Sequence, residues 1–140
     1  MEKTDENKAL TQRFYDEVMN AHNIADIKSF CLDDFIDHNP DPGHTGKGLN
    51  DVITMFNEML TAFPDLHATT EFMVAEGDMV VAYLTMTGTN TGPFANRPPT
   101  NKSVKINGID IIKIKDGKAT ERWGVFQDLS MMTQLGMMGS

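Results

Sequence analysis

The chain has 140 residues, of which 40% are hydrophobic and 23% are charged. This length and composition predict one globular domain that spans residues 1–140. The formal net charge of −8 argues against proteins that bind a phosphate backbone or dock on an anionic membrane, because both classes need a basic surface. The single cysteine, Cys31, excludes an intramolecular disulfide and a multi-cysteine zinc site.

The first ten residues are charged from the second residue onward and lack the apolar stretch of a signal peptide. No apolar run in the sequence approaches the roughly 20 residues that cross a bilayer. We therefore expect a cytoplasmic protein that binds neither membranes nor nucleic acid.

Helical periodicity predicts three helices in the first half of the chain. The first covers residues 5–21, a short second one begins at Ile24, and the third covers residues 49–63 and ends before Pro64. A brief strand is predicted at Phe35. It leads into a loop whose two prolines and glycine exclude regular structure.

From Leu66 onward the apolar residues alternate with the period of strands. Four strands are predicted, over residues 66–74, 79–88, 104–114 and 119–126, with tight-turn signals in the first and last of the gaps between them. A connection at residues 89–101 is long enough to be functional, and a short helix is expected after Asp128. Helices followed by antiparallel strands indicate an α+β fold. We expect a cone-shaped, curved antiparallel or mixed sheet wrapped around three N-terminal helices, with room for a small molecule.

The strand at residues 104–114 carries an acid on its apolar face. Alternation places Asp110 with Ile106 and Ile112, whereas the lysines lie on the other face. Asp110 is therefore expected to point into the interior, where a carboxylate must be paired, hydrogen-bonded or protonated. It is either a structural partner of a donor group or an acid or base of a pocket. A bulge near Gly108 would reverse this parity.

The last strand offers a partner for this carboxylate. Arg122 and Phe126 share one face of the strand, and Trp123 lies on the other face. If the last two strands pair across the tight turn between them, Arg122 can reach Asp110. Such a pair is either structural or orients a substrate oxygen. Phe126 is a candidate substrate contact, and Trp123 either packs in the core or also contacts the substrate.

The loop after the short strand brings two acids and two histidines close together: Asp37, His38, Asp41 and His44. We predict no metal site there, because the spacing matches no helix-borne ligand motif and no cysteine supports it. His38 directly follows a strand and is expected at the pocket mouth as an acid, a base or a hydrogen-bonding group, with Asp37 as a substrate contact. His44 is expected on the surface. Tyr83 could face either layer and is a further candidate substrate contact.

Several short motifs together resemble one family. They are Asp37-His38-Asn39-Pro40, the segments 88–94 and 97–102, Asp116-Gly117-Lys118, the segment 121–126 and Gln134-Leu135-Gly136. On these motifs nearly the whole chain resembles the SnoaL-like polyketide cyclase family. The fold of that family is similar to that of nuclear transport factor two, a cone of long antiparallel strands around three N-terminal helices.

The resemblance implies a reaction and a site. The family's polyketide cyclases close a ring by an intramolecular aldol reaction without metal or organic cofactor. A pocket aspartate acts as general acid and base, and a histidine assists it. Counted from the Asp116-Gly117-Lys118 turn, that aspartate falls at Gly124 and the histidine at Asp110. The chain thus departs from the family's arrangement, and Asp110 becomes the candidate acid and base.

Our leading hypothesis is a small cofactor-free enzyme that binds an apolar or aromatic molecule in the cone. Asp110 would remove an acidic C–H proton and return it to oxygen, while His38 or Arg122 stabilises the oxyanion. A second hypothesis follows from a resemblance to limonene epoxide hydrolase, a relative with the same fold. Its pocket activates water with an Asp–Arg–Asp set, which here would need Asp37 beside Arg122 and Asp110.

The third hypothesis is a module without catalysis that binds a ligand or forms a dimer, because a shared fold does not fix a shared function. We expect a homodimer, since folds of this kind frequently pair through the exposed sheet face. Ile109, Ile111 and Val125 lie on the outer parity of their strands and suit such an interface.

Overall fold

The computed structural model describes residues 2–137 and confirms the order of the predicted elements. In chain order these are α1 (Lys3–Phe14), the π-helical segment η1 (Tyr15–Asn20), the 3₁₀ segment η2 (Ile24–Ser29), β1 (Cys31–Asp37), α2 (Leu49–Ala62), β2 (His67–Glu76), β3 (Met79–Thr89), β4 (Ser103–Lys115), β5 (Lys118–Phe126) and α3 (Asp128–Gln134). None of the helices in this part of the chain is long and apolar enough to span a membrane.

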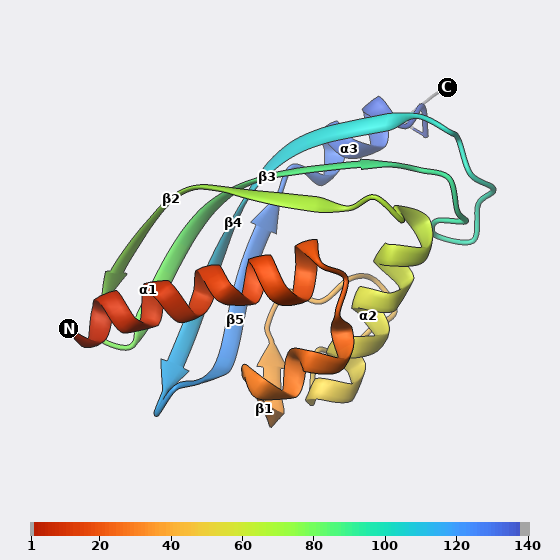
Figure 1. Cartoon of the computed structure of the whole chain (residues 1–140). Helices are drawn as coiled ribbons and strands as arrows, with labels where there is room; N and C mark the ends of the chain where they lie inside the picture. Colours follow the sequence, from red (N-terminus) through yellow and green to blue (C-terminus); the bar gives the residue numbers. More distant parts are fainter. Residues whose placement is uncertain (1, 138–140) are drawn as a thin grey trace.

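The five strands form one curved sheet in the order β1-β5-β4-β3-β2. Strands β2 to β5 pair antiparallel with their neighbours, and β1 joins β5 in parallel. The sheet bends over α1 and α2 and leaves its two edges apart, as Figure 1 shows. The expected fold class, a curved mixed sheet around N-terminal helices, is confirmed.

The helices pack on the concave side of the sheet. Figure 1 shows α1 running along this side, with α2 beside β1. Apolar side chains of α2 and β1 form one core cluster, centred on the buried Phe35, Leu49 and Val52. A second cluster joins Tyr15 to Ala82 and Leu84 of β3. These clusters hold the sheet on the helices.

The first predicted helix continues as a π-helical segment after Phe14. Tyr15, Val18 and Met19 of this segment are buried, as the i, i+3 and i+4 positions of one helix face. Tyr15 is 1% exposed. Because the apolar stripe in the sequence did not include Tyr15, its burial was not predicted.

The alternation along β4 confirms the predicted parity. Val104, Ile106 and Asp110 are buried, and the ladder to β3 runs without interruption from Ser103 to Lys113. No bulge occurs near Gly108, so Asp110 points to the concave side. The register shift in the pairing with β5 comes later, between Lys113 and Ile114.

Candidate functional site

A cavity of about 1410 Å³ lies between the concave face of the sheet and the helices. Its wall includes methionine and phenylalanine side chains from α2, β3, β5 and α3, among them Met55, Met59, Met86, Met131 and Phe126. Thioether and aromatic side chains make an apolar surface that adapts to the shape of a ligand. The cavity is therefore large enough, and apolar enough, for a small organic molecule with more than one ring.

Asp110 lies at the wall of this cavity and accepts two hydrogen bonds. Its Oδ2 accepts from the Tyr15 hydroxyl at 2.8 Å, and its Oδ1 accepts from Arg122 Nε at 2.9 Å. Arg122 Nη2 forms an ion pair with the same Oδ1 at 2.9 Å. The carboxylate is only 6% exposed. The sequence-based prediction that Arg122 reaches Asp110 is thus confirmed.

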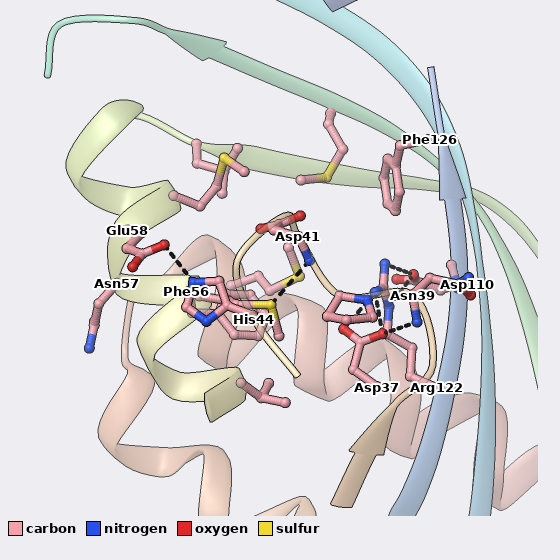
Figure 2. A pocket seen from close by; sticks show the side chains of 18 of the residues that line it. Asp37, Asn39, Asp41, His44, Phe56, Asn57, Glu58, Asp110, Arg122 and Phe126 are labelled. Atoms are coloured by element: carbon pink, nitrogen blue, oxygen red, sulfur yellow. Dashed lines mark hydrogen bonds and ion pairs between the residues drawn. The ribbon is translucent and has the colours of Figure 1, made fainter. Parts of the chain in front are cut away.

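Asp37 binds the other side of the same arginine. Arg122 Nη1 donates to both carboxylate oxygens of Asp37, at 2.8 and 3.0 Å. The backbone N–H of Asn39 adds a bond to Asp37 Oδ1 at 3.0 Å. The parallel pairing of β1 with β5 sets Asp37 opposite Arg122, and so brings the three charged groups into one row. Figure 2 shows Arg122 between Asp37 and Asp110.

The electrostatics of this row keep Arg122 charged. Burial works to lower the pKa of the Arg122 guanidinium, but the charges and hydrogen bonds of Asp110 and Asp37 outweigh it and raise that pKa. Burial and the neighbouring Asp110 carboxylate also raise the pKa of Tyr15, so its hydroxyl stays a donor. One positive charge therefore faces two carboxylates.

A glycine makes room for this arrangement. Asp110 pairs with Gly124 across the β4–β5 ladder, while Arg122 pairs with Ile112. The guanidinium reaches Asp110 diagonally, through the space that a side chain at position 124 would fill. Gly124, where the resemblance expects an aspartate, is thus the residue that admits Arg122.

The structure places Asp37, Asp110, Arg122 and Phe126 on the cavity wall. It does not bring His38 and Trp123 there. They stack on one another at 4.6 Å between ring centres, and His38 Nε2 lies 3.4 Å from Glu121. Because neighbouring residues of a strand face opposite sides, Asp37 points inward and His38 points out.

Tyr83 also lies away from the cavity. Its ring stacks on Phe72 at 5.2 Å, and Phe72 is an exposed residue of β2. Ala82 and Leu84, the neighbours of Tyr83 on β3, are fully buried. Tyr83 therefore belongs to the outer face of the sheet and does not contact a ligand in the cone.

His44 was expected on the surface, and it is half-buried there. Its side chain is 11% exposed and lies between two acids, with Nδ1 at 2.9 Å from Asp51 and Nε2 at 2.8 Å from Glu58. These hydrogen bonds raise the pKa of His44 to about 8. The imidazolium fastens the loop after β1 to helix α2, next to the cavity.

Asp41 lies on the cavity wall as well, although the sequence motifs gave it no role of its own. It stands between Pro40 and Pro42, and this Pro-Asp-Pro pattern is the signal that could have identified it. Burial raises the pKa of Asp41, while Arg122 works in the opposite direction. Among the described residues, no group of three or more His, Cys, Asp or Glu side chains is arranged to hold a metal ion.

Residues 9–135 match the family model described as SnoaL-like polyketide cyclase. No curated protein matches the chain. Among solved structures, a candidate polyketide cyclase from Bacillus cereus is 28% identical, with a TM-score of 0.81 over 96% of this chain and 83% of that chain.

Two further structures show how widely the fold is used. AclR from Streptomyces galilaeus, named as a candidate hydroxylase, is 25% identical with a TM-score of 0.83, over 99% of this chain and 85% of that one. A candidate SnoaL-like polyketide cyclase from Jannaschia sp. is 23% identical with a TM-score of 0.86, over 99% and 98%. The latter likeness concerns the fold alone.

Proposed function

The chain belongs to the SnoaL-like polyketide cyclase family, and on this premise we propose that it is a small enzyme that works without a cofactor. Its chemistry is acid/base catalysis on an apolar ring or carbonyl compound held in the cone. The reaction class that fits best is an intramolecular aldol closure or a related isomerisation.

The observation that carries this proposal is a free acceptor position on Oδ2 of Asp110. A carboxylate offers about four lone-pair positions, two on each oxygen, for hydrogen bonds. Arg122 occupies the Oδ1 side with a hydrogen bond from Nε and an ion pair from Nη2, and Tyr15 uses one position on Oδ2. One position on Oδ2 remains for a proton of the ligand, in a cavity whose wall is otherwise largely apolar.

In the proposed reaction, Asp110 removes a proton from a carbon next to a carbonyl group of the ligand. The electron pair of the broken C–H bond moves toward the carbonyl oxygen and forms an enolate. Arg122 stabilises this negative charge from its fixed place between Asp110 and Asp37. Because the two carboxylates hold the guanidinium, it needs no rearrangement when the charge develops.

The test uses 5-nitrobenzisoxazole, a neutral bicyclic compound that opens to a coloured phenolate when a base removes its one reactive C–H proton. We expect the protein to accelerate this opening over acetate at equal carboxylate concentration. Replacing Asp110 by Asn should lower the rate at least about 100-fold, the usual minimum contribution of a positioned base. Asp34→Asn is the matched control, because Asp34 lies exposed on β1 away from the cavity. Equal rates for folded Asp110→Asn and the wild type would overturn the proposal.

The Asp37–Arg122–Asp110 row favours a second candidate, the activation of water for opening an epoxide. Distances of 2.8 to 3.0 Å join these three side chains, as an Asp–Arg–Asp set requires. Styrene oxide in ¹⁸O-labelled water is a direct test. Diol carrying the label, formed by the wild type and lost in Asp37→Asn, would favour the hydrolase. Absence of diol would leave proton abstraction as the remaining chemistry.

A further inference from the structure

The backbone of Asp41 is held rigidly at the mouth of the cavity. Pro40 and Pro42 restrict the chain on both sides, and a residue before proline is confined to extended conformations. The backbone N–H of Asp41 donates to the thioether sulfur of Met55 on α2 at 3.4 Å. The His44 amide binds the Asp41 carbonyl at 3.1 Å. Four constraints thus fix the main chain of this one residue.

The side chain of Asp41, by contrast, is left free. Within residues 2–137, no donor or cation lies within bonding distance of its carboxyl oxygens. Figure 2 shows this carboxyl in the open part of the cavity, between His44 and the Asp37–Arg122–Asp110 row. A rigid backbone that carries an unpaired acid into a cavity is the arrangement expected of a group that acts on a ligand.

Partial burial favours the protonated form of Asp41. Burial raises the pKa of this carboxyl, and Asp37 and Asp128 raise it further, while Arg122 and His44 lower it. An apolar ligand in the cavity would remove the remaining water from Asp41 and so raise its pKa further.

We propose that Asp41 is a second catalytic residue of the cavity, the acid that gives a proton to the ligand oxygen on which negative charge develops. This inference rests on the proposed function, in which Asp110 is the base. Asp110, which is paired with Arg122 and Tyr15, would take the proton from carbon, and the unpaired Asp41 would give a proton to oxygen.

The steps balance for an aldol closure. The C–H bond of the ligand breaks and its proton moves to Asp110. The enolate carbon forms a bond to the second carbonyl carbon, whose C=O electron pair moves to oxygen. That oxygen takes the proton of Asp41. Asp110 ends protonated and Asp41 ionised, and exchange with solvent at the cavity mouth restores both groups.

Two probes that differ only in their leaving oxygen separate the base from the acid. The phenolate released by 5-nitrobenzisoxazole is stable and needs no acid, whereas unsubstituted benzisoxazole releases a more basic oxygen that benefits from protonation. Asp110→Asn should slow both probes by at least about 100-fold. Asp41→Asn should slow the unsubstituted probe by about 10- to 100-fold and the nitro probe less than about threefold. Asp34→Asn serves as the control for both.

A purely structural role of Asp41 would lower both rates equally or neither, and either result would overturn the inference while the proposed function stands. If the wild type accelerates neither probe, both fail together. A second readout does not depend on turnover. The carboxyl carbon of Asp41, assigned by comparison with Asp41→Asn, should titrate in NMR spectra above the ordinary range of an aspartate. A pKa at or below that range would contradict the inference.

Discussion

The guanidinium of Arg122 lies in the space that a side chain on Gly124 would occupy. Both residues face the cavity from β5, two positions apart. Arg122 can cross to Asp110 only because the residue opposite Asp110 has no side chain. The charged row of the site and the missing side chain at Gly124, where the resemblance expects an aspartate, are therefore one structural feature.

Replacing Gly124 by Ala should displace Arg122 and weaken its bonds to Asp110 and Asp37. We expect a loss of about 2 to 4 kcal/mol in the free energy of unfolding, since a partly broken buried ion pair leaves charge uncompensated. Val125→Ala is the control, because Val125 is 72% exposed on the outer face and should change stability by less than about 0.5 kcal/mol. Urea unfolding of both variants measures the difference. If Gly124→Ala is as stable as the wild type, the Arg122 guanidinium can bind Asp110 and Asp37 even with a side chain at position 124.

The hydrogen bond from Tyr15 to Asp110 predicts a contrast between the two tyrosines of the chain. Tyr15→Phe removes the donor and leaves a buried carboxylate oxygen with less compensation, at a cost of about 1 to 3 kcal/mol. Tyr83→Phe is the matched change on the outer face and should be close to neutral. Thermal unfolding of the two variants compares them directly. Equal effects would mean that the Tyr15 hydroxyl contributes nothing to holding Asp110.

Residue patterns alone predict the part of the site that rests on strand parity and hairpin register. The continuous ladder of β4 turns Asp110 inward, and the two-residue turn at Asp116 sets Arg122 within reach. His38 was predicted at the pocket mouth because it directly follows a strand. The observed β1 extends to Asp37, whose side chain points inward, and His38 after it stacks on Trp123 instead.

The sequence analysis missed features of three kinds. Tyr15, which packs against Ala82 and Leu84 of β3, lies at helical spacing from Val18 and Met19 but is a polar aromatic residue and was left out of the apolar stripe. Asp41 and His44 lie in a loop without periodicity, where the Pro-Asp-Pro pattern marks Asp41 but the contacts with α2 form only in the fold. Tyr83 had a weak signal, because Thr85 and Thr87 on its own parity mark the wetter face of β3.

His44 predicts a pH dependence of stability. Its pKa rises from 6.5 to about 8 in the folded state, because Asp51 and Glu58 accept its two N–H groups. The stabilisation is therefore complete below pH 6.5 and is lost as the pH rises through about 8. His44→Gln should flatten this part of the stability curve, whereas His67→Gln, on an exposed position of β2, should not. If the free energy of unfolding of the wild type does not change between pH 6 and 9, the bonds of His44 to Asp51 and Glu58 do not stabilise the fold.

Burial lowers the reactivity of the Cys31 thiol. It raises the pKa of the Cys31 thiol to about 12, against a smaller opposite effect of Lys118. The thiolate is the reactive form, so Ellman's reagent at pH 8 should modify the native protein far more slowly than the protein in urea. Rapid and complete modification of the native protein would show that the first residue of β1 is accessible.

The homodimer stays a prediction of the sequence. Ile109 and Val125, two of the residues expected at its interface, are exposed on the outer face of the sheet, together with Phe72 and Val74. Native mass spectrometry of the wild type and of Val125→Lys tests this placement. A dimer that the lysine dissociates supports it, and a monomeric wild type contradicts it.

The most direct test of the account is a crystal structure with the ring-opened nitrophenol product of the probe reaction bound. We predict that the ring lies in the cone, with a ligand atom about 2.6 to 3.2 Å from Asp110 Oδ2, the reach of a proton transfer. A product seated elsewhere, or an Asp110 carboxylate separated from it by other side chains, would contradict the role we give to Asp110.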